Sequence, residues 1–193
     1  MFLKHLSYTV SRKQIHTLYA RFLTFQPELI DNVLQISYEE LEAQTSQSNP
    51  LQQRFLFALF GRKKVANNQQ REEKSKLKFE QFAQKMAIFQ NVNSGSKYAT
   101  ITSKAEFLFD LFDIQCENVL KSNQVHAVFK LINKSRYRND LSTQEQEDLA
   151  RNFINEIHSL VNIESDLEVV RKEDFVKACE MKPDIVSNLR ILF

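Results

Sequence analysis

Apolar residues recur along the chain at the three- and four-residue spacing that places side chains on one face of an α-helix. Polar residues fill the other positions and the segments between these stretches. The whole pattern predicts about eight amphipathic helices. The clearest stretches are residues 15–25, 51–60, 79–89, 107–112, 125–132, 149–161 and 175–179.

Glycine and proline are rare, with two glycines and three prolines in 193 residues. All-β and α/β folds need many tight turns, which these residues favour, so the predicted fold class is all-α. Only residues 90–100, QNVNSGSKYAT, combine Gly, Ser and Asn as a linker does. The predicted division is therefore 1–90, a linker at 91–102, a second lobe at 103–182 and an amphipathic tail at 183–193. Ser103 and Ser142 are predicted to cap helices, Ser142 with Glu145 in a capping box.

A polar segment between two predicted helices, residues 113–124, has the twelve-residue outline of an EF-hand calcium loop. Such a loop needs side-chain oxygens at positions 1, 3 and 5, a carbonyl at 7, a sharp turn at 6 and a bidentate Glu at 12. Asn at position 6 suits the turn because it accepts left-handed backbone angles. The neutral amide at position 12 cannot supply two anionic oxygens, so no metal is expected, although this loop is the best candidate. Its ligand positions are Asp113, Gln115, Glu117, Val119 and Gln124.

The eighth position of this loop is apolar, and the same feature recurs in three other segments. In paired EF-hand loops this residue forms a short β-bridge to the sister loop, so it can persist where the ion is lost. The segments and their eighth-position residues are 113–124 with Leu120, 163–174 with Val170, 29–40 with Ile36, and 61–81 with Leu77. The repetition predicts four helix-loop-helix units, none of which has a full ligand set. Asp113 and Glu117 are expected to cap helices or to bond the loop's own amides.

The chain resembles calcineurin B and its homologous proteins, which are EF-hand relatives of the neuronal calcium sensors. The likeness covers residues 11–180, and NPLQQR before an apolar helix is its most specific part. It is carried by QIHTLYARF (14–22), ISYEEL (36–41), SNPLQQRFLFALF (48–60), LKFEQFAQKMAIF (77–89) and KAEFLFDLFD (104–113). The resemblance implies two lobes of paired, degenerate EF-hands with short β-bridges between paired loops. The chain departs from the family at the calcium ligands and in a loop insertion at 61–76.

Calcineurin B-like proteins hold an amphipathic helix of another protein in an apolar groove. Sixteen phenylalanines and no tryptophan suit such a surface, although each Phe could instead fill the core. The resemblance therefore implies a non-catalytic structural or adaptor subunit that clasps a partner helix without calcium. The alternative is a calcineurin B-like regulatory subunit with weak calcium binding at 113–124. The predicted groove residues are Phe22, Phe55, Leu59, Phe82, Met86, Phe89, Phe107, Leu111, Phe129, Phe153 and Phe175.

Charge and composition narrow the remaining possibilities. The net charge of +2 gives no strong field, so no nucleic-acid partner is expected. No apolar run approaches the roughly 20 residues of a membrane span. Cys116 and Cys179 show no zinc spacing, which favours a reducing intracellular compartment. The four histidines form no ligand motif, and no cofactor or enzymatic activity is expected.

The first 27 residues carry basic but no acidic side chains and faintly resemble a mitochondrial presequence. A basic first helix is the alternative. We expect an intracellular complex, with a mitochondrial one favoured over ciliary, cytoskeletal or cytoplasmic ones. The insertion could be a docking arm for an acidic surface or a solvated loop. The tail could cover the protein's own groove or insert into a neighbour.

Overall fold

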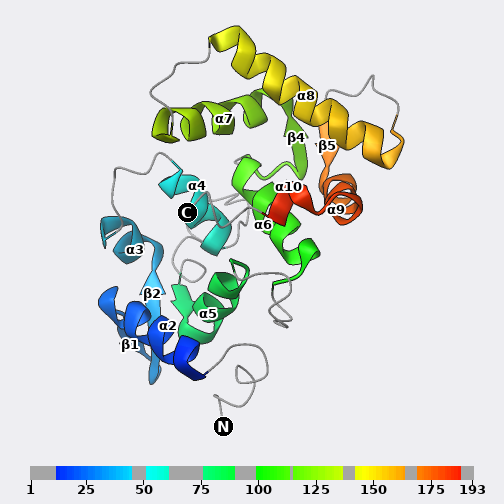
Figure 1. Cartoon of the computed structure of the whole chain (residues 1–193). Coiled ribbons are helices and arrows are strands. Elements are labelled where there is room, and N and C mark those ends of the chain that lie inside the picture. Colours follow the sequence, from blue (N-terminus) through cyan, green and yellow to red (C-terminus); the bar gives the residue numbers. More distant parts are fainter. Residues whose placement is uncertain are drawn as a thin grey trace.

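The chain folds into a mostly helical structure with two small antiparallel sheets (Figure 1). The computed structural model describes residues 12–44, 51–60, 76–89, 99–113, 115–136, 142–163 and 169–187. Within these ranges there are nine helices, in line with the helical fold predicted from the apolar spacing. They are α2 (Arg12–Thr24), α3 (Tyr38–Gln44), α4 (Gln52–Phe60), α5 (Phe79–Ala87), α6 (Ile101–Phe112), α7 (Ser122–Arg136), α8 (Thr143–Val161), α9 (Lys172–Met181) and α10 (Asp184–Ser187).

Five short strands join the helices. One sheet has the order β1-β2-β3, and the other consists of β4 and β5. The strands are β1 (Glu28–Ile30), β2 (Val33–Ser37), β3 (Lys76–Lys78), β4 (Val119–Lys121) and β5 (Val169–Arg171). Each of the last four runs directly into a helix, so the same strand-helix step occurs four times along the chain.

The predicted pairing of the eighth-position residues is confirmed by the strand register. Ile36 lies opposite Leu77, and Leu120 lies opposite Val170. Leu77 is 6% exposed and the other three are fully buried. Opposed apolar side chains on one face of an antiparallel pair stabilise it by about 0.2–1 kcal/mol each. These apolar pairs therefore join the loops by side-chain packing.

Residues 29–40 differ from the predicted loop. They begin with a β-hairpin, in which β1 and β2 pair around the two-residue turn Asp31-Asn32. Both turn residues have positive φ, 49° and 61°, as the favoured hairpin turn requires. Leu29 and Val33, which stand where ligands would be needed, are strand residues instead. Asp31 and Glu40, the only possible ligands here, thus lie on different elements, the turn and α3.

Two large clusters of buried side chains form the core, and α4 contributes to both. Ala58 belongs to the cluster built mainly on α6 to α10, whereas Leu56 and Leu59 belong to the cluster around α2, β2 and α5. Phe55 packs against both clusters. The described helices nevertheless separate along the molecule, with α7 and α8 at one end and α2 at the other (Figure 1). The division into two lobes stays a prediction, since residues 90–98 of the linker lie outside the described ranges.

Helix ends test the two predicted caps. Ser142 and Glu145 form the predicted capping box, with Glu145 N donating to Ser142 Oγ and Ser142 N donating to Glu145 Oε2. Ser103 is not a cap. Thr100 caps α6 instead, and its hydroxyl accepts from Ser103 N at 3.0 Å.

Candidate functional site

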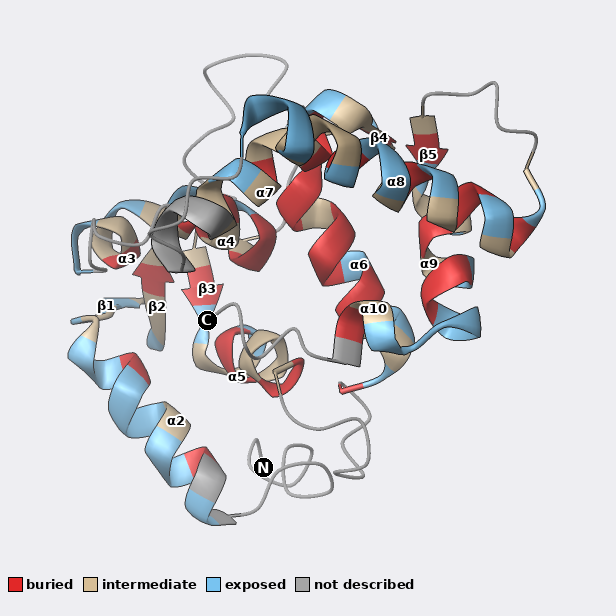
Figure 2. Cartoon of the chain, turned by 45° about the horizontal axis from the view of Figure 1, so that its top comes forward, coloured by how far each residue is buried: buried red, intermediate tan, exposed pale blue. Residues whose placement is uncertain are grey.

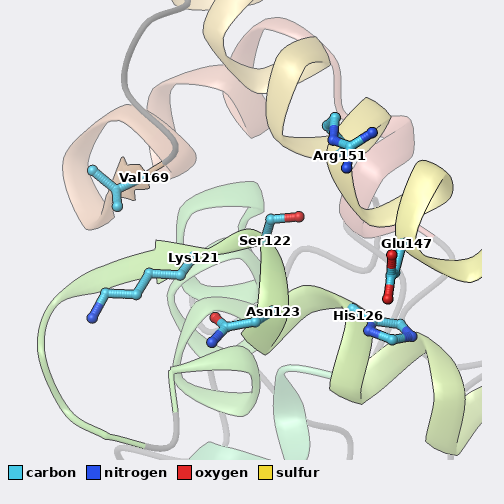
Figure 3. Close-up of a pocket in the computed structure, with 7 residues that line it drawn as sticks. All are labelled: Lys121, Ser122, Asn123, His126, Glu147, Arg151 and Val169. Carbon is cyan, nitrogen blue, oxygen red and sulfur yellow. The ribbon is translucent and has the colours of Figure 1, made fainter.

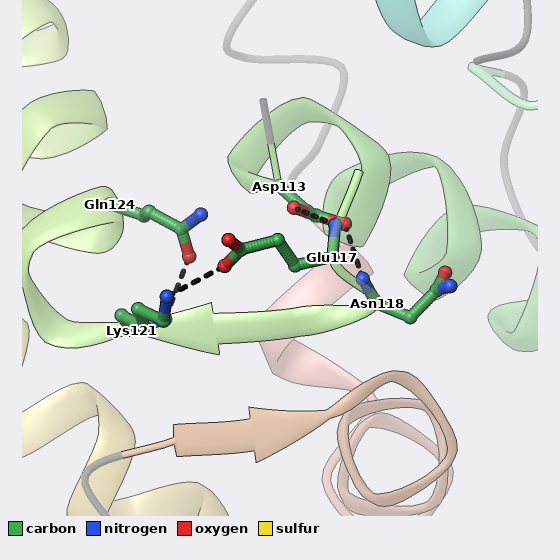
Figure 4. A network of polar contacts seen from close by, with 5 residues as sticks. All are labelled: Asp113, Glu117, Asn118, Lys121 and Gln124. Carbon is green, nitrogen blue, oxygen red and sulfur yellow. Dashed lines mark hydrogen bonds and ion pairs between the residues drawn. The ribbon is translucent and has the colours of Figure 1, made fainter. Parts of the chain in front are cut away.

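The candidate ion loop at 113–124 begins with a buried carboxylate that binds two amides of the loop itself. Asp113 is 3% exposed. Its Oδ1 accepts a hydrogen bond from Glu117 N at 3.1 Å, and its Oδ2 accepts one from Asn118 N at 3.0 Å (Figure 4). The expectation that Asp113 bonds the loop's own amides is confirmed. The left-handed turn expected at Asn118 is also present, with φ 59°.

The other two anchor positions of the loop are engaged as well. Glu117 Oε2 pairs with Lys121 Nζ at 2.7 Å, so a tethered ammonium neutralises the second carboxylate. Gln124 Oε1 accepts from Lys121 N at 2.8 Å. Gln124 Nε2 is buried without a hydrogen-bond partner in the described part of the chain, and it lies on the same side of β4 as the Glu117 carboxylate (Figure 4). A donor thus faces the region where an ion would need an oxygen.

Position 12 has the same local role in three of the four loops. Ser37 N donates to Glu40 Oε2 at 2.6 Å, and Lys78 N donates to Gln81 Oε1 at 3.0 Å. These contacts match that of Lys121 and Gln124. In each case the last strand residue is the helix N-cap, and the side chain three residues later binds its amide, as in a capping box. A Glu or Gln three residues after the last strand residue is the sequence signal for this role.

The described residues do not converge on an ion site. No three His, Cys, Asp or Glu side chains within the described ranges lie close enough to hold a metal. Gln115 is exposed, and the carbonyl of Val119 belongs to strand β4. Residues 164–168 of the fourth loop and 61–75 of the insertion lie outside the described ranges. Calcium at 113–124 would have to displace Lys121 from Glu117, and it would meet the neutral amide of Gln124 at position 12.

The predicted groove residues divide by burial. Six are buried in the two core clusters, and five are half-buried. Phe55 and Phe89 form one half-buried group, with ring centroids 5.8 Å apart, and Phe129 and Phe153 form another at 5.7 Å. The buried six are Phe22, Leu59, Phe82, Phe107, Leu111 and Phe175, and the fifth half-buried residue is Met86. In the isolated chain, the six buried residues fill the interior and do not line a groove. Figure 2 shows this burial along α6 and α9.

An open cavity of about 520 Å³ lies at the N-terminal end of α7, against α8 and β5 (Figure 3). It is lined by Lys121, Ser122, Asn123, His126, Glu147, Arg151 and Val169. The Arg151 guanidinium pairs with Asp148 at 3.3 Å, and Lys121 pairs with Glu117. The cavity therefore has both signs of charge on its wall, and Val169 is the one apolar residue among those that line it.

Buried cations and a buried histidine were not predicted from the sequence. Arg54 Nη1 donates to Leu111 O and Phe112 O at 3.4 Å, at the end of α6 and the entry to the candidate loop. Lys104 Nζ donates to Ile88 O at 2.6 Å, at the end of α5. His158 Nε2 lies 3.0 Å from Val169 O. Each contact ties one element to another, so these groups have a structural role.

The two cysteines should differ sharply in reactivity. Cys179 is fully buried, and burial, followed by the charge of Glu180, raises its pKa to about 12. It stays a protonated thiol at pH 8, whereas Cys116 is only half-buried. We expect a thiol reagent such as DTNB to titrate one cysteine rapidly in the native protein and two in denaturant. Equal rates for both in the native state would contradict this assignment, and Cys116→Ser should remove the fast phase.

The raised pKa of Cys179 also determines how its contribution to the stability of the fold changes with pH. The folded pKa of Cys179 lies above its ordinary value of 9.0. Its contribution to stability is therefore complete below about pH 9 and is lost as the pH rises toward the folded pKa.

None of the described helices has the length and apolar character of a membrane span. No protein-family model matches this chain, and no curated protein matches it in sequence.

Proposed function

We propose that the protein is a non-catalytic structural subunit of the degenerate EF-hand type, which clasps an amphipathic helix of a partner protein without calcium. The four strand-helix steps and the two loop pairings, Ile36 with Leu77 and Leu120 with Val170, support the EF-hand part of the proposal. The partner part rests on the resemblance to calcineurin B-like proteins.

One observation carries the calcium-independent part. The oxygens at positions 1 and 12 of loop 113–124 already bind main-chain amides, and Glu117 is paired with Lys121. The loop therefore has its folded shape with its ligand groups in use. An ion would have to separate Lys121 from Glu117, and at position 12 it would gain a neutral amide oxygen in place of a bidentate carboxylate. A loop of this kind acts as a permanent scaffold.

The half-buried aromatic residues are the best-placed part of the predicted groove. Phe129 and Phe153 stack against Phe112 from α7 and α8, with ring centroids 6.2 and 5.8 Å from it. A partner helix that separated α7 from α8 would cover these rings with its own apolar face. Since no ion opens the loops, the binding energy of the partner itself must open them, which favours a lasting complex over a switch.

Calcium titration by isothermal calorimetry tests this proposal. The unmodified chain should show no binding stronger than about millimolar. Gln124→Glu restores the bidentate position and should strengthen any binding, whereas Gln81→Glu is a matched control at position 12 of a loop that has no full ligand set. Micromolar binding by the unmodified chain would reject the proposal. That outcome would favour the calcineurin B-like regulatory subunit, to which the retained Asp113, Glu117 and left-handed Asn118 point.

A further inference from the structure

The hairpin at the start of the predicted loop 29–40 exposes one edge of the three-stranded sheet. β1 is the outermost strand in the order β1-β2-β3, and no described strand pairs with its outer side. It lies at the margin of the molecule in both overall views (Figures 1 and 2). Unpaired edges are templates for another strand, and proteins usually blunt them with charge, proline or a helix.

The turn determines which backbone groups face outward. In a two-residue hairpin turn the flanking residues, Ile30 and Val33, form a hydrogen-bonded pair. The next pair, Leu29 and Leu34, is then a pair without mutual hydrogen bonds. The N–H and C=O of Leu29 consequently point away from β2, toward the open edge.

Leu29 also presents its side chain to solvent. It is 67% exposed, the largest value among the exposed large apolar residues within the described ranges, and Val33 at the hairpin tip is 37% exposed. The only charge on the strand, Glu28, lies 3.6 Å from Lys76 across the sheet. The edge thus combines an unused donor and acceptor, an exposed leucine and a partly neutralised charge. These are the features that strand addition uses.

We propose that β1 is a homodimerisation edge, at which a second copy of this chain adds its own β1 antiparallel. Leu29, whose backbone groups face outward, is the central residue of the three-residue strand β1. A two-fold axis beside Leu29 therefore places two copies of β1 antiparallel, with each Leu29 opposite the other. Leu29 of each copy would exchange two hydrogen bonds with Leu29 of the other. The two leucine side chains would lie side by side on one face, and each Glu28 would face Ile30 of the other copy and not its own counterpart.

The resulting assembly is a continuous six-stranded sheet, with the two hairpins at its centre. Pro27 has no N–H to offer, which limits the pairing to this short register. The contact is small compared with the roughly 1,200–2,000 Å² of stable interfaces, so the dimer should be weak and concentration-dependent. This inference does not depend on the proposed clasping function, because β1 lies outside the predicted groove.

Sedimentation velocity of the full chain from about 10 μM to 1 mM tests the proposal, since weak contacts of this size dissociate in that range. Leu29→Pro removes the outward N–H and takes no hydrogen bond from the hairpin, because that N–H is not used by β2. The association constant should fall about tenfold or more, since two hydrogen bonds disappear from the dimer. Leu29→Lys keeps the N–H and sets like charges face to face, so it should weaken the dimer similarly and recover partly in salt.

Leu149→Lys is the matched control, because Leu149 is 45% exposed on α8, away from the edge. It should leave the association constant unchanged. Circular dichroism and the amide signals of Ile30 and Val33 report whether each variant keeps its fold and hairpin. A chain that stays monomeric at 1 mM, or a dimer that neither Leu29 variant weakens, would overturn the proposal.

Discussion

Phe175→Ala should lower the free energy of unfolding by about 3–5 kcal/mol, the range for removing a large buried aromatic side chain. Phe175 is fully buried and belongs to the larger core cluster. Its ring centroid lies 5.7 Å from that of Phe109 and 6.2 Å from that of Phe153. The substitution therefore leaves a cavity between α6, α8 and α9, in addition to losing the transfer free energy of the ring.

Urea unfolding followed by circular dichroism measures this loss. Phe57→Ala is the control, because Phe57 is 43% exposed on α4; it loses a ring contact with Tyr38 at 5.6 Å and should cost no more than about 1.5 kcal/mol. Phe175 was also a predicted groove residue, so the experiment separates its two roles. If Phe175→Ala were as stable as Phe57→Ala, the ring would not be part of the core.

Pairing of the loops was predictable from sequence because it depends on a single local feature. In paired EF-hand loops the apolar eighth-position residue forms a β-bridge to the sister loop, so each such residue predicts a partner. The structure pairs Ile36 with Leu77 and Leu120 with Val170. The weakness of Gln124 as a calcium ligand was also predictable from sequence, because a neutral amide cannot supply two anionic oxygens.

Other features needed turn chemistry or three-dimensional packing. Asp31 and Asn32 both tolerate the left-handed backbone angles that a two-residue hairpin turn needs, but without a glycine they do not distinguish a hairpin from the loop predicted at 29–40. The burial of six predicted groove residues could not be read from spacing, because core and groove both use one apolar helix face. Nor does hydropathy reveal a lysine or arginine inside the core, since such residues are rarely buried unless paired.

Lys104 shows how such a buried cation stabilises the fold. It lies in the first half of α6, where a positive charge is unfavourable near the helix N-terminus, and it is only 1% exposed. Its Nζ donates to the carbonyl of Ile88, the C-cap residue of α5. The last carbonyls of a helix have no partner within the helix, so Lys104 supplies one from a neighbouring element.

Lys104→Met should therefore lower the free energy of unfolding by about 2 kcal/mol, because Met keeps the length of the side chain and removes its donor. Lys130→Met on the exposed side of α7 is the control and should change stability by less than about 0.5 kcal/mol. Urea unfolding of both variants gives the comparison, and hydrogen exchange at the end of α5 should quicken in the first variant alone. A Lys104→Met protein as stable as the control would mean that the Ile88 carbonyl gains nothing from this ammonium, and that the tie between α5 and α6 depends on apolar packing alone.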